Sequence, residues 1–185
     1  EQEALLTLSD LEAMWACLSE VDGLAFYNAG SVAGASQRHK HLQLVPFPLI
    51  KEGDRLPIDP WIHAVNSSNI TVIPDFPFIH AFKKLDRIDN PEQLLDCYSE
   101  LLETVGIDPN QPLQTAPYNF LATREWMMIV PRSQAEYCSI AVNSLAFAGA
   151  LLVRTTEQLE TLKQLRPLNF LKNVAIASPT TSGWS

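Results

Sequence analysis

The residues best suited to chemistry are two histidines and a glutamine at alternate positions. His39, His41 and Gln43 follow a stretch of mostly small residues, NAGSVAGASQ, at 28–37. Alternate side chains of an extended strand point to one face, so this spacing predicts that the three lie together on a strand over 38–46. Loops of small residues let a backbone approach a phosphate closely. The stretch therefore indicates a phosphate-handling site with a histidine at its centre.

A histidine can attack phosphorus because a neutral imidazole nitrogen is available near pH 7. The attack forms an N–P bond that is easily broken again, so that one displacement becomes two. Such a site must hold the second ring nitrogen and stabilise charge on the phosphate oxygens. The amide of Gln43 faces the same way as the histidines and could serve the second purpose. Ser36 and the backbone of residues 34–37 could do the same.

Two non-catalytic interpretations of the histidine pair remain open: a pair of metal ligands and a solvent-exposed face of a sheet. From spacing alone, both are commoner than a nucleophile. A metal site needs further ligands, and His63 and His80 stand apart from any carboxylate or cysteine at ligand spacing, so we expect no metal site. We expect those two histidines to be half-buried and hydrogen-bonded.

Composition and charge restrict the class of protein. The chain has 185 residues, of which 46% are hydrophobic and 18% charged, as in an ordinary globular domain. Its net charge of −8 disfavours binding to nucleic acid or to an anionic membrane, and we find no apolar run long enough to span a bilayer. Three widely spaced cysteines, Cys17, Cys97 and Cys138, favour a reduced, cytoplasmic setting and predict small buried hydrophobes.

Hydrophobic periodicity predicts strands and helices in alternation. A capping box of Ser9 and Glu12 predicts the start of a first helix. The remaining elements are helices at 10–21, 91–105, 156–165 and 167–174, strands at 24–28, 38–46 and 78–83, a hairpin at 118–132, a loop at 51–69, and a segment at 139–153 that fits helix or strand. Strands that are local and joined by a hairpin favour an α+β fold with an antiparallel sheet. We expect one domain over 1–185, with a motif-bearing core at 1–50 and a C-terminal subregion at 106–175.

Longer stretches resemble a known family. FYNAGSVAGASQRHKHLQLVPFPL (26–49) is similar to the ATP adenylyltransferases, the diadenosine tetraphosphate phosphorylases of the histidine-triad (HIT) and galactose-1-phosphate uridylyltransferase superfamily. YNFLATREWMMIVPR (118–132) and VNSLAFAGALLVR (142–154) resemble the family's C-terminal region. The resemblance covers nearly the whole chain, to about residue 175, and implies a HIT-like antiparallel sheet with peripheral helices.

The resemblance also implies roles for individual residues. His41 matches the nucleophile that takes up AMP, His39 the preceding histidine that orders the site, and Gln43 the glutamine on the α-phosphate. The other matching positions are nucleotide and phosphate contacts: Asn28, Gly34, Ala35, Ser36, Gln37, Asn143, Ser144, Leu145, Ala150 and Arg154. At Leu145, Ala150 and Arg154 some relatives carry Thr, Met and Lys, so the contacts to the distal nucleotide are expected to differ.

The activity implied is phosphorolysis of a dinucleoside tetraphosphate to ADP and ATP through an adenylylated His41. A catalytically silent nucleotide-binding module is the alternative, and a nucleotidyl-sugar transferase of the same superfamily is a third interpretation. We expect no resident cofactor, with Mg²⁺ as an option that accompanies the nucleotide; the expected partners are dinucleoside polyphosphate, ATP, ADP and phosphate. The family also has an N-terminal portion that does not match here. We therefore expect an open sheet edge beside His41, and self-association or pairing with such a segment.

Overall fold

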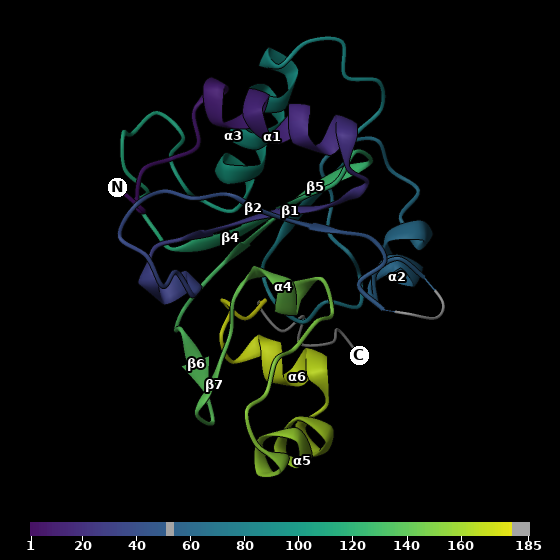
Figure 1. Ribbon diagram of the computed structural model, residues 1–185, viewed down its shortest axis with the longest axis vertical. Helices are drawn as coiled ribbons and strands as arrows, with labels where there is room; N and C mark the ends of the chain where they lie inside the picture. Colours follow the sequence, from purple (N-terminus) through teal and green to yellow (C-terminus); the bar gives the residue numbers. More distant parts are fainter. Residues whose placement is uncertain (51–53, 179–185) are drawn as a thin grey trace, which may run out of the picture.

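The centre of the molecule is a five-stranded antiparallel sheet (Figure 1). The computed structural model describes residues 1–50 and 54–178. The strand order is β2-β1-β4-β5-β3. The strands are β1 (Gly23–Ala29), β2 (Gln43–Pro46), β3 (Ala81–Lys84), β4 (Tyr118–Ala122) and β5 (Trp126–Pro131), and a separate short ladder joins β6 (Glu136–Tyr137) to β7 (Ile140–Ala141). In the described part of the chain β2 pairs only with β1, so the sheet edge beside the histidine motif is open, as expected.

Helices cover both faces of the sheet, as Figure 1 shows. On one face lie α1 (Leu8–Glu20) and α3 (Glu92–Thr104). On the other lie α2 (Asp59–Ala64), α4 (Ser144–Phe147) and α6 (Pro167–Lys172), with α5 (Thr156–Leu165) packed against α6. A single turn of 3₁₀ helix, η1 (Ser31–Ala33), follows β1. The α+β fold with an antiparallel sheet and peripheral helices is thereby confirmed.

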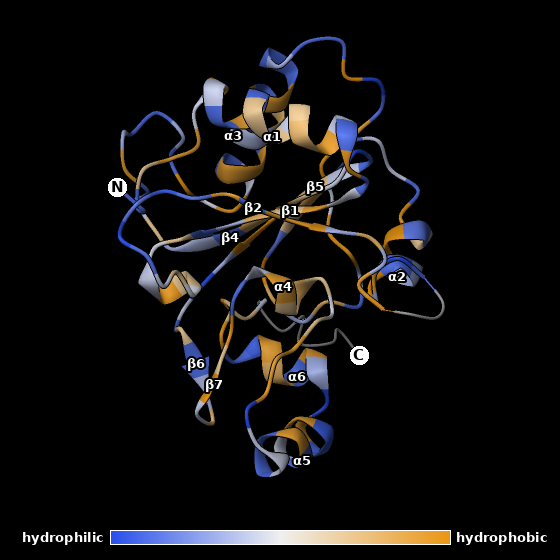
Figure 2. Cartoon of the chain, in the orientation of Figure 1, coloured by the Kyte–Doolittle hydropathy of each residue, from blue (hydrophilic) through white to orange (hydrophobic). Residues whose placement is uncertain are grey.

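Strand β5 shows why the sheet needs helices on both sides. All six of its residues are buried, and they alternate between two cores. Met127 and Ile129 pack against α1 and α3, while Met128 and Val130 pack toward α4 and α6. A strand buried on both faces is hydrophobic at every position, which explains the continuous apolar run WMMIV. In Figure 2 the hydrophobic colour accordingly gathers along the central strands and on α4.

The first helix begins two residues earlier than its sequence suggests. The N-cap is Thr7, whose hydroxyl accepts from the Asp10 backbone N–H while the Asp10 carboxylate accepts from the Thr7 N–H. The capping box expected at Ser9 and Glu12 is therefore wrong, since both residues lie inside the helix. The Lys40 ammonium also binds the Asp10 carboxylate. The cap formed by Thr7 and Asp10 is therefore stabilised by a residue 30 positions away in the chain.

The structure confirms most other elements, corrects two and resolves the one that was ambiguous. The expected strands at 24–28 and 78–83, the hairpin at 118–132 and the helix at 91–105 are present within a few residues. However, β2 starts only at Gln43, and α2 interrupts the loop expected at 51–69, of which 51–53 lie outside the described residues. The ambiguous segment 139–153 contains β7 and α4. Among the cysteines only Cys97 is buried, since Cys17 and Cys138 are exposed.

Candidate active site

His39 and His41 are neighbours in space, although the segment that carries them is not a strand. Their ring centroids lie 5.6 Å apart. The ladder with β1 starts at the pair Phe26–Gln43, so the two histidines precede it. Lys40 turns away from them, and its ammonium binds the Leu5 carbonyl and the Asp10 carboxylate. Because Lys40 is anchored in this way, it points away from His39 and His41, as in a strand, although no sheet ladder is present.

The surroundings of His41 determine which of its ring nitrogens is free. Nδ1 lies 3.1 Å from the His39 carbonyl oxygen and 3.2 Å from Oε1 of Gln2. The Gln2 amide is oriented by its own nitrogen, which donates to the Asn28 carbonyl, so the atom facing His41 is the amide oxygen. Both neighbours of Nδ1 are therefore acceptors, and Nδ1 carries the proton. The lone pair is left on Nε2, the form that a nucleophilic imidazole needs.

The loop between β1 and the histidines is held in a tight conformation by two glycines at positive φ. Gly30 has φ of 86° and Gly34 has φ of 93°. A Cβ at Gly34 would lie 2.4 Å from the Val142 carbonyl oxygen, so the loop packs directly on the segment that leads into α4. The loop and the C-terminal region, more than 100 residues apart in sequence, thus form one wall.

A polar cavity of about 540 Å³ lies on the outer side of this loop. Three of the residues expected to contact phosphate line it: Ala35, Ser36 and Gln37. Its other lining residues are Ser31 from η1, Arg38, and Glu1 and Glu3 of the N-terminal segment. The cavity therefore offers hydroxyl, amide and guanidinium donors opposite two carboxylates.

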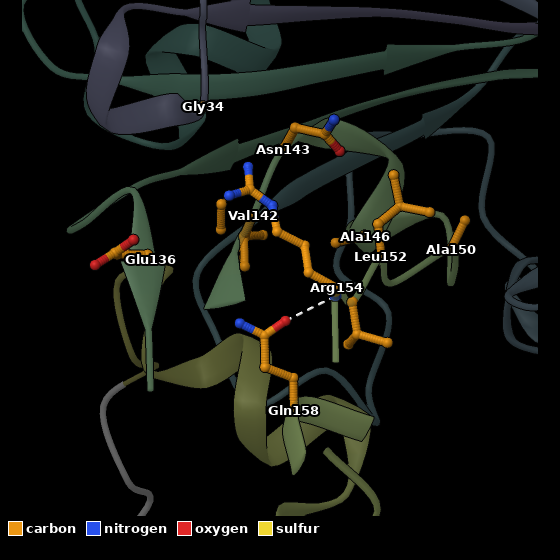
Figure 3. Close-up of a pocket in the computed structure, with 11 residues that line it drawn as sticks. Gly34, Glu136, Val142, Asn143, Ala146, Ala150, Leu152, Arg154 and Gln158 are labelled. Atoms are coloured by element: carbon orange, nitrogen blue, oxygen red, sulfur yellow. Dashed lines mark hydrogen bonds between the residues drawn. The ribbon is translucent and has the colours of Figure 1, made fainter. Parts of the chain in front are cut away.

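A second pocket, of about 320 Å³, lies on the other side of Gly34 (Figure 3). It contains four residues expected at the nucleotide: Gly34, Asn143, Ala150 and Arg154. The Arg154 side chain extends across the pocket toward Asn143, and its backbone N–H donates to Oε1 of Gln158 at 2.8 Å. The remaining lining is apolar apart from Glu136 and Gln158, and comprises Ala141, Val142, Ala146, Leu152 and Val153. The Arg154 guanidinium suits the phosphates of a nucleotide, and the partly apolar lining suits its base.

The structure separates other expected site residues from this pair of cavities. Gln43 is exposed at the start of β2 and lines a different, partly apolar groove against α1. Leu145 is partly buried and packs into the core beneath α4. Ser144 is fully buried, and its hydroxyl donates within the protein. The expected ligand contact of Ser144 stays a prediction, and its hydroxyl here bonds the Tyr27 carbonyl and Oδ1 of Asn28.

Asn28 belongs with Ser144 to a buried network that links the sheet to α4. Its Oδ1 accepts from the Ser144 N–H at 2.8 Å, from the Ser144 hydroxyl at 2.7 Å and from Nδ2 of Asn119 at 2.9 Å. Asn119 faces Asn28 across the β1–β4 ladder and also donates to the Ala33 carbonyl. The side-chain oxygen of Asn28 is thus committed to the protein, and it positions the start of α4.

Arg132 completes this network from the end of β5. Arg132 is only 2% exposed, and its guanidinium has carbonyl and amide acceptors. It donates to the carbonyls of Ala33 at 3.1 Å and Val142 at 3.2 Å and to Oδ1 of Asn119 at 2.6 Å, and it stacks over Phe147 at 5.5 Å. Burial lowers the pKa of Arg132 to about 10, so the group stays protonated at neutral pH. The Arg132 guanidinium therefore binds both segments that meet at Gly34, the loop through Ala33 and the segment before α4 through Val142.

Three residues of the site lie outside the histidine motif and were missed from the sequence: Gln2, Asn119 and Arg132. A polar residue within an apolar strand is a signal for Asn119, and an arginine at the end of the strand WMMIVP is one for Arg132. Gln2 carried no signal, because its role depends on the N-terminal segment lying beside residues 38–41.

The two other histidines differ from each other. His80 is hydrogen-bonded as expected, since its Nε2 accepts from the Ile73 N–H at 2.7 Å and its Nδ1 bonds the Phe78 carbonyl at 2.9 Å, but it is buried rather than half-buried. His63 is exposed on α2, so the expectation of half-burial is wrong there. Among residues 1–50 and 54–178 no three histidine, cysteine or acidic side chains gather as metal ligands, and no helix there is long and apolar enough to cross a membrane.

Comparison with known proteins places this site in context. Residues 1–64 match the model of the Ap4A phosphorylase N-terminal domain, and residues 74–177 match that of the ATP adenylyltransferase C-terminal domain. Similar curated proteins are diadenosine 5',5'''-P1,P4-tetraphosphate phosphorylase 2 of Saccharomyces cerevisiae, 30% identical over 99% of this chain, and protein APA1 of the same yeast, 27% identical over 84%. The chain spans 64% of the length of the first and 55% of the second.

Solved structures show the same similarity in three dimensions. Yeast Ap4A phosphorylase Apa2 in complex with Ap4A matches with a TM-score of 0.77 at 25% identity, covering 97% of this chain and 67% of that one. Its complex with AMP matches with a TM-score of 0.77 at 26% identity, covering 99% and 67%.

Proposed function

Because the chain belongs to the ATP adenylyltransferase family, we propose that it catalyses phosphorolysis of diadenosine tetraphosphate to ADP and ATP through an adenylylated His41. The observation that carries the proposal is the state of the His41 ring. Its Nδ1 proton is held by two acceptors, and Nε2 is left as a free nucleophile. The names of the yeast relatives, which include an Ap4A phosphorylase, support the choice of substrate.

The reaction consists of two displacements at one phosphorus atom. In the first, Nε2 of His41 attacks the α-phosphorus at one end of the dinucleotide, an N–P bond forms, and the P–O bond to the departing ATP breaks. In the second, an oxygen of inorganic phosphate attacks the same phosphorus and the N–P bond breaks, which releases ADP and restores the ring. Neither step needs a proton from Nδ1.

Donors near His41 would act on the charge that develops on the phosphate oxygens. Ser36 and Gln37 offer their backbone N–H groups, a hydroxyl and a side-chain amide, whereas the N–H groups of Gly34 and Ala35 are bonded within the loop. Gln43 lies two residues beyond the nucleophile. The pocket of Arg154 and Asn143 would hold the second nucleotide, with the guanidinium on its polyphosphate. Mg²⁺ would arrive with the nucleotide.

The test is a product assay combined with covalent trapping. The protein is incubated with diadenosine tetraphosphate and phosphate, with Mg²⁺ or with EDTA, and ADP and ATP are separated by chromatography. In parallel, the protein is exposed to α-labelled dinucleotide without phosphate and the label on protein is counted. We expect label on the wild type, none on His41→Ala, and reduced label on His39→Ala.

The matched control is His63→Ala, which removes an exposed histidine on α2 and should leave labelling unchanged. Label that survives in His41→Ala and disappears in His39→Ala would reverse the assignment of the nucleophile. Binding of the dinucleotide without products or label would replace the proposal with the silent binding module.

A further inference from the structure

Gln2 is a buried polar side chain in direct contact with the nucleophile, and it lies 37 positions before the first residue of the histidine motif. It is 1% exposed. Its amide nitrogen donates to the Asn28 carbonyl, and its amide oxygen lies 3.2 Å from Nδ1 of His41. Its backbone is held as well, because its N–H donates to the Arg38 carbonyl at 3.2 Å and the Tyr27 hydroxyl donates to its carbonyl. Gln2 thus connects β1 to the histidine segment.

We infer that Gln2 is a positioning residue for His41: its amide oxygen accepts a hydrogen bond from Nδ1–H and so directs the Nε2 lone pair toward the phosphorus. The consequence for catalysis rests on the proposed function, but the effect on the ring does not. The His39 carbonyl, which belongs to the same segment as His41, also accepts a hydrogen bond from Nδ1–H. Gln2 differs from it in being anchored to β1, so it fixes the ring relative to the sheet.

The contact matters more during the reaction than before it. When Nε2 forms its bond to phosphorus, the ring becomes positively charged while Nδ1 keeps its proton. A hydrogen bond from a charged donor is stronger than one from a neutral donor. The Gln2 oxygen therefore stabilises the transition state and the adenylylated ring more than the resting imidazole, which is the condition for faster chemistry.

Other charged or titratable groups near this contact must be held constant in a test. They are Arg38, His39 and Lys40 in the histidine segment, Asp10 paired with Lys40, Glu1 and Glu3 on either side of Gln2, and Tyr27 on β1. Burial raises the pKa of Tyr27, so its hydroxyl stays neutral over the assay range. Substitution of Gln2 alone leaves this set unchanged.

The experiment compares Gln2→Glu, Gln2→Met and the control Gln114→Met in the intact protein. Gln114 donates its amide nitrogen to the carbonyl of Ala29, the residue after Asn28, so it caps the same strand as Gln2 does. The first readout is ¹⁵N NMR of the His41 ring across pH. The second is the pH dependence of His41 adenylylation in a single turnover, with KM measured separately.

We expect the neutral wild-type ring to carry its proton on Nδ1. Gln2→Glu should raise the pKa of His41 by about one unit or more, because a carboxylate then faces the imidazolium, and the acid limb of the rate profile should move with it. Gln2→Met should lower that pKa and slow adenylylation about tenfold or more through loss of a hydrogen bond to a charged group, with little change in KM. Gln114→Met should leave the titration and the profile as in the wild type.

A wild-type ring protonated on Nε2, or an identical His41 titration in all four proteins, would overturn the inference. A purely structural role would lower the melting temperature of Gln2→Met without moving the titration, so thermal stability is recorded alongside. The NMR titration needs no substrate. If the wild type fails to turn over dinucleotide, the proposed function is lost while the titration still decides the role of Gln2.

Discussion

Substitution of Gly34 by alanine tests whether the loop at Gly34 must pack directly on the backbone before α4, with no room for a side chain. Gly34 has φ of 93°, and an added Cβ would lie 2.4 Å from the Val142 oxygen and 3.0 Å from Cα of Asn143. The Val142 oxygen cannot move easily, because it accepts hydrogen bonds from Arg132. Two costs therefore add: about 1–2 kcal/mol for a non-glycine residue in the left-handed region, and about 1–3 kcal/mol for overpacking against backbone.

Gly106 is the matched control for this substitution. It has φ of 81°, but a Cβ there would meet nothing within 4 Å. Gly106→Ala should therefore show the conformational cost alone, about 1–2 kcal/mol. The difference between the two variants measures the clash at Val142.

The assay is urea unfolding of both variants, with thermal melts as a second measure. For a chain of this size 1 kcal/mol shifts the melting temperature by about 2–4 °C. We expect Gly106→Ala to melt about 2–8 °C below the wild type, and Gly34→Ala to fall several degrees further and to lose His41 adenylylation. Equal destabilisation by the two substitutions would refute the enforced contact.

Three further predictions concern other parts of the site and the core. Gln43→Ala should lower kcat by about 10²-fold with a smaller effect on KM if the amide acts on charge in the transition state; a change confined to KM would show uniform binding instead. Arg132→Met should cost about 3 kcal/mol or more in urea unfolding, since it leaves several buried acceptors unpaired, and Arg132→Lys should recover only part of this because it lacks the planar fork. Burial, opposed in part by the bond to the Phe78 carbonyl, lowers the pKa of His80 from 6.5 in the folded state, so its neutral form is favoured by folding. That contribution is present above pH 6.5 and is lost as pH falls through the lower folded-state pKa. Wild type should therefore lose more stability between pH 7 and 5 than His80→Gln, with the exposed His63→Gln as control.

Local pattern predicted most of the secondary structure and the residue proposed as the nucleophile. The apolar run of β5, the helical spacing of α3 and its end shortly before Gly106 depend on near neighbours in the chain, so the sequence predicted them. His41 was recognised because its motif is contiguous. The sequence predicted the first helix cap at Ser9, whereas the structure places it at Thr7, whose partner Asp10 is also bound by the distant Lys40. The start of β2 depended on pairing with β1.

Tertiary structure alone decided how the site is assembled. The contacts that orient His41 and the loop join residues far apart in the chain: Gln2 to His41 across 39 positions, Arg132 to Ala33 across 99, and Asn28 to Ser144 across 116. The resemblance implies ligand contacts for Asn28 and Ser144, and only the fold shows that the Asn28 side-chain oxygen and the Ser144 hydroxyl also bond each other. The physical reason is that a buried polar group must find a partner wherever the fold brings one. That partner is set by the packing of strands and helices, which no short stretch of sequence contains.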